Sequence, residues 1–204
     1  MRPPAASFAD GITASDLGPP DLALALEQHE AYCRVLEELG LTLERLPPDP
    51  EFPDSTFVED AAIVTSKGAI LTRPGAPSRA GEVEAVGAAL GRWFPELDRL
   101  TPPGTLDGGD VCEAGEHFFI GLSQRTNQEG AAQLSAWLGG RRLIAWREVA
   151  GHEALRGWEV VKAPEGEEYA ANCIRVNDAV LVAEGFPGTA ALLAGLSPST
   201  NGMT

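Results

Sequence analysis

Several features that would place this chain in common functional classes are scarce. Only two of its 15 basic residues are lysines, Lys67 and Lys162, and the formal net charge is -15. A nucleic-acid surface needs clustered Lys and Arg, so the composition argues against one. No hydrophobic run reaches the length of a transmembrane helix, and the N-terminus does not resemble a signal peptide. We therefore predict a cytoplasmic protein without a membrane partner.

Cysteine and histidine are also rare, with three residues of each type. The cysteines (Cys33, Cys112 and Cys173) are widely spaced in apolar stretches, which is typical of buried, reduced thiols. The histidines lie at no metal-ligand spacing from a cysteine or an acid, so we predict no metal site. His29 falls on the apolar stripe of an expected helix and is interpreted as a core or edge residue.

The remaining composition is typical of one globular domain, predicted to span residues 1–204. The chain has 44% hydrophobic residues, which suffices for a substantial core in a domain of this size. Acidic residues outnumber basic ones by 30 to 15. This excess favours a cationic small molecule as ligand, although a negative surface also serves solubility.

The chain is organised around the stretch Leu106 to Asp110, in which two acids flank a Gly-Gly pair before an apolar hairpin. Acids at the start of a buried strand, with glycines that allow close approach to the backbone, suit a cationic ligand. A solvated Asp-Gly turn is the alternative interpretation of this stretch alone.

The hairpin belongs to a repeat of an acidic strand start, a tight turn, an apolar strand, a loop, a helix and a short strand. The copies begin near Glu59, Asp107 and Tyr169. We expect helices over residues 21–40, over residues 82–94 and from the residue after Asn127 to Leu138, and a strand over residues 41–46. Residues 143–155 are interpreted as the helical tail of a further copy, followed by a strand at 158–161. Three complete and two partial units predict an α/β ring of five blades that gathers Glu59, Asp60, Asp107, Asp110 and Asn172 around one axis.

Two arginines, Arg79 and Arg125, follow the second strand of two copies. Guanidinium groups at these positions are suited to bind a carboxylate in bidentate fashion. Acids together with arginines favour a zwitterionic ligand that carries an extra positive group, as arginine does. The alternative is that these arginines cap helices or pair with surface acids.

Four motifs resemble dimethylarginine dimethylaminohydrolase, a family of the guanidino-group-modifying (amidinotransferase) superfamily. They are the segments 54–60 (DSTFVED), 106–110 (LDGGD), 125–127 (RTN) and 171–173 (ANC). The resemblance implies a five-bladed β/α-propeller of the pentein type, with parts of several blades absent from the 204 residues. It also implies hydrolysis of Nω-methylated arginine to citrulline and an amine, through a Cys thiouronium intermediate and a general acid–base His.

The resemblance also implies roles for individual residues. Asp60 and Asp107 would be catalytic, since they bind the guanidinium and polarise its carbon. Asp54 would hold the substrate α-amino group, while Arg79 and Arg125 would clamp its carboxylate. Phe57 and Glu59 would line the pocket, and Ile12 would lie on a lid loop. No metal or organic cofactor is implied, and the partner would be an arginine-like small molecule; a homodimer is possible in such an enzyme.

The sequence departs from the family at the positions of the two residues that carry out the reaction, the catalytic His and Cys. The catalytic His of the family precedes the segment that begins at Arg141, but here Gly139-Gly140 joins Arg141 directly, and His152 lies in a different context. The family Cys would come next after Thr204, and Cys173 belongs to the 171–173 motif instead. We expect the segments that carry the His and Cys to belong to the complete polypeptide. Arginine or agmatine deimination, ligand binding without turnover, and a purely structural propeller are the alternatives.

Overall fold

The computed structural model describes residues 1–13, 18–114, 117–139, 142–146 and 162–195, which form two compact units. Unit 1 consists of the described residues of Met1–Arg34 and Leu43–Glu148, and unit 2 of those of Val35–Thr42 and Val149–Thr204. Each unit is treated by itself below. The predicted single domain over residues 1–204 therefore stays a prediction.

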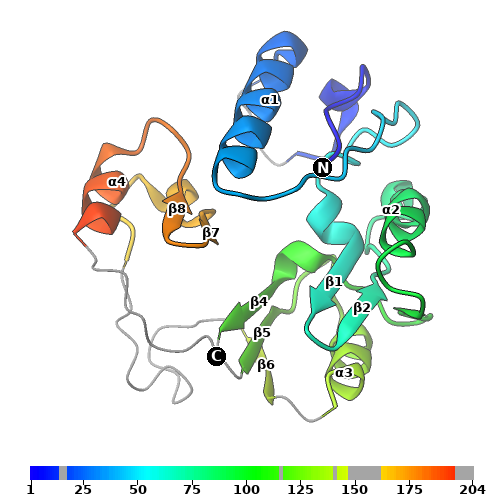
Figure 1. Cartoon of the computed structure of the whole chain (residues 1–204). Coiled ribbons are helices and arrows are strands. Elements are labelled where there is room, and N and C mark those ends of the chain that lie inside the picture. Colours follow the sequence, from blue (N-terminus) through cyan, green and yellow to red (C-terminus); the bar gives the residue numbers. More distant parts are fainter. Residues whose placement is uncertain (14–17, 115–116, 140–141, 147–161, 196–204) are drawn as a thin grey trace. The chain divides into compact units, whose positions relative to one another are not determined.

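The first sheet of unit 1 has the strand order β1-β2-β3 (Figure 1). The strands β1 (Ala62–Thr65) and β2 (Gly68–Leu71) form an antiparallel hairpin. Its tight turn ends at Gly68, whose φ of 148° is a conformation that side-chain-bearing residues rarely adopt. The helix α2 (Glu82–Leu90) follows, and β3 (Leu97–Arg99) returns parallel to β2. The expected helix over residues 82–94 is thus confirmed with an earlier end.

The second sheet repeats this arrangement. The strands β4 (Val111–Ala114) and β5 (His117–Gly121) form a hairpin, α3 (Gln128–Trp137) follows, and β6 (Arg142–Trp146) pairs parallel to β5. Two copies of the predicted repeat are therefore confirmed. The helical interpretation of residues 143–155 is wrong over its first part, because residues 143–146 lie in β6; the remainder and the expected strand at 158–161 lie outside the described residues.

The larger hydrophobic core of unit 1 joins the two sheets to α3. The central strands β2 and β5 are buried on both faces, and they contribute Ile70, Phe118 and Ile120, each at most 4% exposed. Leucines from α3 and from the segment before β4 complete this core. Its buried members are Ile70, Leu100, Leu106, Phe118, Ile120, Ala131, Leu134 and Leu138. The acidic stretch 106–110 is therefore anchored by Leu106, which is fully buried.

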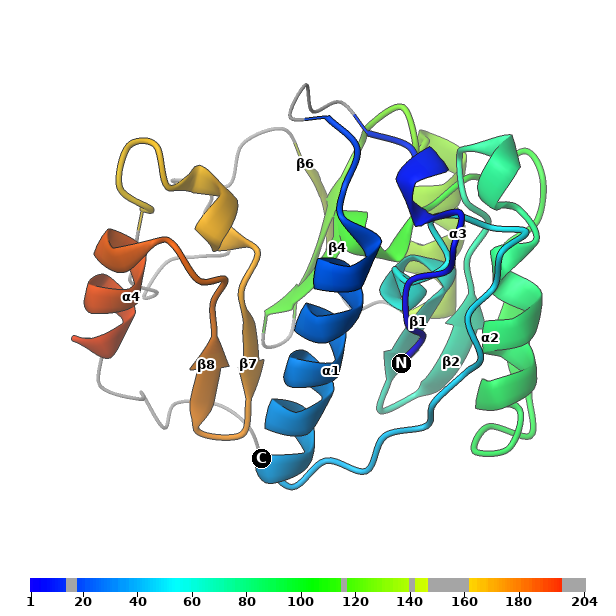
Figure 2. The same ribbon diagram turned by 90° about the horizontal axis from the view of Figure 1, so that it is seen from above.

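Unit 2 contains the opening of the third predicted copy. The strands β7 (Ile174–Val176) and β8 (Ala179–Leu181) form an antiparallel hairpin, and α4 (Pro187–Ala194) lies beside it (Figure 2). Asn177 occupies the turn with φ 52°, which fits the Asn-Asp turn expected there. The Glu167 carboxylate accepts hydrogen bonds from the backbone N–H groups of Gly188 and Thr189, at 3.0 and 2.6 Å, and so caps α4.

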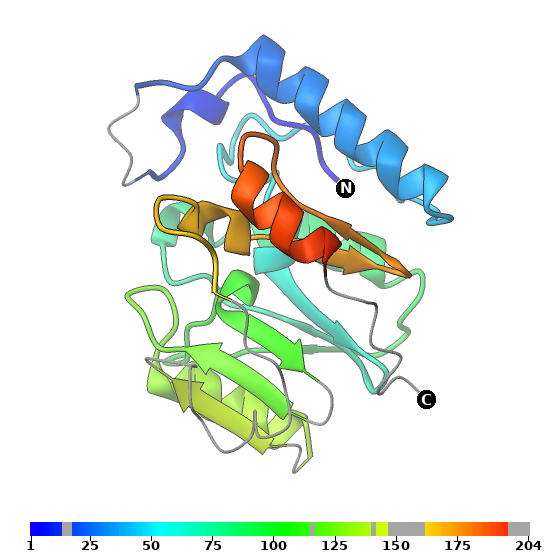
Figure 3. The same cartoon turned by 90° about the vertical axis from the view of Figure 1, so that its left-hand side faces the viewer.

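The first helix, α1 (Leu22–Glu38), is confirmed with its predicted start. The Asp21 carboxylate accepts hydrogen bonds from the backbone N–H groups of Ala23 and Leu24, which is a typical N-cap. The N-terminal segment, with the 3-10 turn η1 (Phe8–Asp10), runs along this helix (Figure 3). The prediction of a strand over residues 41–46 is wrong, because this segment is irregular. Two hydrogen bonds join its backbone to that of Met1.

The described strands form two three-stranded sheets and one hairpin, and among these residues no sheet closes into a ring. The five-bladed propeller is therefore not directly visible, although the α/β character and the repeated blade are. None of the helices in the described residues is long and apolar enough to cross a membrane.

We predict that replacement of Asn127 by Ala lowers the free energy of unfolding by about 1–2 kcal/mol. Its side-chain carbonyl oxygen accepts hydrogen bonds from the backbone N–H groups of Gly130 and Thr105, at 2.8 and 3.0 Å, so it caps α3 and fastens the preceding loop. Urea unfolding followed by circular dichroism measures the change. Gln128→Ala, at an exposed position next to it, is the control and should unfold at the wild-type midpoint; equal midpoints for all three proteins would contradict the capping role.

Candidate functional site

The predicted acids come together where the turns before the two hairpins of unit 1 meet. The 3-10 turn η2 (Val58–Ala61) precedes β1, and η4 (Gly108–Asp110) precedes β4. These turns lie side by side above their strands (Figure 1). The backbone N–H of Gly109 donates a 2.8 Å hydrogen bond to the Asp60 carboxylate. The equivalent ends of two blades thus place Asp60 and Asp107 in one cluster.

The Gly-Gly pair makes this close approach possible. A Cβ atom on Gly108 would lie 2.0 Å from the carbonyl oxygen of Glu59, which is far inside contact distance. A Cβ atom on Gly109 would lie 2.7 Å from a carboxylate oxygen of Asp60. The expectation that these glycines allow close approach to the backbone is confirmed, and the approaching group is the neighbouring turn.

Asp107 is fully buried and carries an oxygen without a hydrogen-bond partner among the described residues. Its Oδ1 accepts a 3.0 Å hydrogen bond from the backbone N–H of Gly75, while Oδ2 receives none. Burial, together with the negative charge of Asp60, raises the pKa of Asp107 despite the nearby arginines. A buried, underused carboxylate oxygen is a feature that proteins keep mainly at functional sites.

Arg79 lies among these acids, 5% exposed, at the end of the 3-10 turn η3 (Pro77–Arg79). Its Nη1 is 2.7 Å from Asp60 Oδ2 and 3.5 Å from Asp107 Oδ2, and Glu82 binds its Nε and Nη2. Burial alone would lower the pKa of Arg79, but the bonds to Glu82 and Asp60 raise it well above its usual value. This position differs from the expected clamp, because the guanidinium is committed to carboxylates of the protein itself.

Arg125 is placed differently, with 49% of its side chain exposed. Its Nη2 is 2.7 Å from Asp110 Oδ1, and its Nη1 is 3.9 Å from the free oxygen of Asp107. Asp110 also accepts hydrogen bonds from the hydroxyls of Ser123 and Thr126, at 3.0 and 2.7 Å. Arg125 therefore reaches from the buried acids to solvent, as a residue that contacts a ligand should.

Asp54 connects the site to the segment predicted to be a lid. The residue is 7% exposed, and its two carboxylate oxygens lie 3.1 and 3.2 Å from the backbone N–H of Ile12. A Cβ atom on Gly11 would lie 2.6 Å from Asp54 Oδ1, so a larger residue there would displace this carboxylate. The Ile12 side chain is 63% exposed. The structure thus brings Ile12 and Asp54 together, while the roles that the resemblance implies for them stay predictions.

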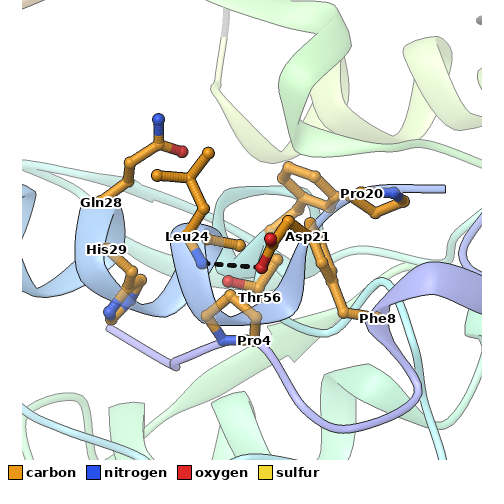
Figure 4. Close-up of a pocket in the computed structure, with 10 residues that line it drawn as sticks. Pro4, Phe8, Pro20, Asp21, Leu24, Gln28, His29 and Thr56 are labelled. Atoms are coloured by element: carbon orange, nitrogen blue, oxygen red, sulfur yellow. Dashed lines mark hydrogen bonds between the residues drawn. The ribbon is translucent and has the colours of Figure 1, made fainter. Parts of the chain in front are cut away.

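Glu59 and Phe57 lie at the edge of the acid cluster. Glu59 is exposed as a residue, yet burial of its carboxyl group, together with the charge of Asp60, raises its pKa. Phe57 is 42% exposed. It lines a shallow groove of about 410 Å³ between the N-terminal segment, α1 and Thr56 (Figure 4). Neither Asp60 nor Asp107 lines this groove, so Phe57 faces a surface beside the acids.

His29 also lines the groove and is half-buried, which agrees with its interpretation as a core or edge residue. Its Nδ1 lies 3.8 Å from the sulfur of Cys33, but its Nε2 is buried without a hydrogen-bond partner in the described part of the chain. Burial lowers the pKa of His29 and favours the neutral ring. Of the three cysteines, only Cys33 is buried; Cys112 and Cys173 are exposed, contrary to expectation.

Sequence reasoning missed three residues of the cluster. Glu82 is 2% exposed and pairs with Arg79, and its spacing of three residues after Arg79 was the available signal. The Thr126 hydroxyl accepts a hydrogen bond from the backbone N–H of Asp107, and the Ser123 hydroxyl donates one to the Asp110 carboxylate. Asn172 lies in unit 2, so its predicted place beside these acids stays a prediction. Within the described ranges, no three His, Cys, Asp or Glu residues are grouped to hold a metal ion.

We predict that the affinity for a cationic arginine analogue falls as the pH is lowered from about 7.5 to about 5. Because burial raises the pKa of Asp107, protons compete with the ligand at a higher pH than for an ordinary aspartate. The raised pKa values of Asp107, Glu59 and Glu82 mean that the folded state binds these protons more tightly than the unfolded chain. These groups therefore favour folding on acidification, and binding should weaken before the fold does.

Calorimetric titration with arginine at several pH values, alongside thermal unfolding at each pH, measures both effects. A guanidinium keeps its charge throughout this range, so any change belongs to the protein. An affinity that stays constant down to about pH 5 would contradict a role for Asp107 in cation binding.

Known proteins of similar sequence and fold identify the family of this chain. The chain is 42% identical to N(G),N(G)-dimethylarginine dimethylaminohydrolase of Pseudomonas aeruginosa, over an alignment of 214 positions including gaps. The alignment covers 92% of this chain and 84% of the relative. Its fold matches a crystal structure of that Pseudomonas enzyme, a variant complexed with citrulline, with a TM-score of 0.89 and 40% identity over 95% of this chain and 86% of that chain. No protein-family model matches the chain.

A more distant structure shows the same fold. The N-terminal domain of ArgZ, an arginine dihydrolase from Cyanobacteria, matches with a TM-score of 0.76 at 18% identity, over 97% of this chain and 88% of that domain. At this identity the similarity speaks for the fold alone. The extent of the Pseudomonas match and the acid cluster where its motifs meet lead to one conclusion: this chain belongs to the dimethylarginine dimethylaminohydrolase family.

Proposed function

We propose that this protein hydrolyses Nω-methylated arginine to citrulline and methylamine or dimethylamine. The observation that carries the proposal is the pair Asp60 and Asp107, which already faces a guanidinium, that of Arg79, at 2.7 and 3.5 Å. Among the described residues this Asp107 oxygen, Oδ2, accepts no hydrogen bond, so it is a buried acceptor for a ligand guanidinium. The family membership and the citrulline bound to the Pseudomonas relative support the same substrate class.

Asp60 and Asp107 would hold the substrate guanidinium and polarise its carbon toward a nucleophile. In a buried site their charges act with little screening, which strengthens this effect. The reaction adds water across the C–N bond and releases the amine. The Cys nucleophile and the acid–base His stay expectations that the family resemblance implies.

The remaining residues would recognise the amino-acid end of the substrate. Arg125 is the better placed of the two predicted clamps, because its half-exposed side chain can meet a carboxylate from solvent beside its ion pair with Asp110. Arg79 would have to release a carboxylate of the protein before it could do so. Asp54 would bind the α-amino group next to Ile12 on the lid, while Phe57 and Glu59 would line the entrance. These roles are proposals from the family motifs and the positions described above.

The wider setting is proposed from the same family and from the composition. We propose a five-bladed propeller of which the two described sheets form two blades, in keeping with the ArgZ and Pseudomonas folds. A cytoplasmic location, a possible homodimer, and the lack of nucleic-acid partners and of cofactors stay predictions.

A second candidate function, binding of arginine analogues without turnover, is favoured by one feature of the sequence. Leu138 is followed by Gly139-Gly140-Arg141, with no His at the place where the family carries its catalytic one. Such a protein would use the same acids to hold the ligand and would release it unchanged.

The experiment incubates the purified protein with Nω,Nω-dimethylarginine, arginine and agmatine, and measures citrulline or the corresponding ureido product together with heats of binding. Product from dimethylarginine above all supports the hydrolase. Binding without product supports the second candidate. A clear preference for agmatine, which has no carboxylate for Arg125, would overturn the proposed substrate.

A further inference from the structure

Glu82 is a buried acid to which the proposed reaction assigns no task. It opens α2 and is 2% exposed, and it accepts hydrogen bonds from Nε and Nη2 of Arg79, the shortest at 2.8 Å. Burial raises its pKa, an effect that Arg79 partly offsets. A carboxylate kept in such a place needs a strong reason, because burial of a charge is costly.

The geometry divides the Arg79 guanidinium into two edges. The Nε–Nη2 edge faces Glu82, whereas Nη1 faces Asp60 and Asp107. One positive charge therefore lies among three carboxylates. With Glu82 neutralising Arg79, Asp60 and Asp107 keep their full excess of negative charge.

We propose that Glu82 is a positioning and specificity residue: it holds and neutralises Arg79, so that Asp60 and Asp107 retain the negative charge that selects a cationic guanidinium. This inference rests on the proposed function, in which these two aspartates bind the substrate guanidinium. Without the Glu82 charge, Arg79 becomes an internal competitor, since its guanidinium then satisfies the aspartates at the expense of the ligand.

The substitution Glu82→Gln tests this role because it removes the charge and keeps the size and one acceptor oxygen. Nω,Nω-dimethylarginine and citrulline are the two probes, since they share the amino-acid end and differ in the charge of the distal group. We expect the Kd for dimethylarginine to rise about tenfold, as for the loss of one nearby charge in a partly screened site, and the Kd for citrulline to change less than about twofold.

Two further variants frame the measurement. Glu82→Asp retains the charge and should restore the preference for dimethylarginine over citrulline. Glu84→Gln changes an exposed acid of the same helix, which pairs with Arg99 on the surface, and should bind both ligands as the wild type does. Thermal unfolding of each variant establishes that it is folded.

The outcomes separate the inference from the proposed function. If Glu82→Gln weakens both ligands equally, or neither, Glu82 has a structural role only and the inference is wrong, while the proposed function stands. If the Gln variant does not fold, Glu82→Asp decides, since loss of the cation preference in that variant also contradicts the inference. If the wild type binds neither ligand, the proposed function fails and the inference falls with it.

Discussion

Replacement of Asp107 by Asn is expected to weaken binding of Nω,Nω-dimethylarginine at least about 100-fold and to leave almost no turnover. Asp107 is fully buried, and its Oδ2 has no hydrogen-bond donor among the described residues. The substitution removes a charge that faces the ligand cation in a site where water screens it poorly. Calorimetry for binding and a citrulline assay for turnover measure the two effects.

The same substitution should not destabilise the fold. Burial and the neighbouring Asp60 raise the pKa of Asp107, so the charged form works against folding at neutral pH. The Asn side chain still accepts the hydrogen bond from Gly75 through its carbonyl oxygen. We therefore expect Asp107→Asn to unfold at the wild-type temperature or above, a loss of function with no loss of stability.

The control for this prediction is Asp98→Asn, the same change at an exposed position on β3. It should bind and turn over ligand as the wild type does. Near-normal activity of Asp107→Asn would show that Asp107 is only a turn residue. A large drop in its unfolding temperature would show that the charge of Asp107 stabilises the fold, contrary to the prediction.

Replacement of Gly108 by Ala is expected to destabilise the protein by about 3 kcal/mol or more. The new Cβ would lie 2.0 Å from the Glu59 carbonyl oxygen and 3.3 Å from the Cα of Asp60, both backbone atoms that cannot rotate away. The turns η2 and η4 would have to separate, which would also part Asp60 from Asp107. Urea unfolding measures the stability, and a ligand titration on any folded fraction measures the site.

Gly91→Ala is the matched control. Gly91 follows α2 with a helical backbone, and its Cβ would meet its nearest neighbour at 3.4 Å, an ordinary contact distance. This variant should be as stable as the wild type or slightly more so, since Ala restricts the unfolded chain. A Gly108→Ala protein with the stability and affinity of wild type would mean that the two turns do not touch as described.

The local elements of unit 1 could be predicted because their patterns are strong. The tight turn at Gly68 and the apolar run 118–120 identify the two hairpins, and Asp21 marks the start of the first helix. The repeat then predicted that the acids before the hairpins meet, and Asp60 and Asp107 do so. The repeat alone supports this prediction, because the same end of each repeated unit lies near the common axis of the ring.

Other features depended on tertiary contacts that no local pattern carries. The strand expected over residues 41–46 fails because, in the described part of the chain, the backbone of this segment bonds to Met1 and Leu36 and joins no sheet. The apolar run 143–146 fits a helix and a buried strand equally well, so the sequence alone does not identify it as a strand. Its pairing with β5 decides between the two. Cys112 lies at an exposed position of β4, between the apolar Val111 and the charged, exposed Glu113.

The site itself shows the same division. Arg79 was recognised as important, but its burial against Glu82 depends on how η3 joins α2. From the sequence we expect Arg79 to bind the carboxylate of a ligand. In the structure its guanidinium instead lies against three carboxylates of the protein. The charge balance of the cluster, and with it the role proposed for Glu82, becomes visible only when these residues are seen together.

The most direct test of the account is a crystal structure of the protein with bound Nω,Nω-dimethylarginine. We predict that the guanidinium nitrogens lie within hydrogen-bond distance of the Asp60 and Asp107 carboxylates, with the ligand carboxylate at Arg125. A ligand bound elsewhere, for example in the groove beside His29, with Arg79 still filling the space between the two aspartates, would contradict the claim that these acids form the guanidinium site.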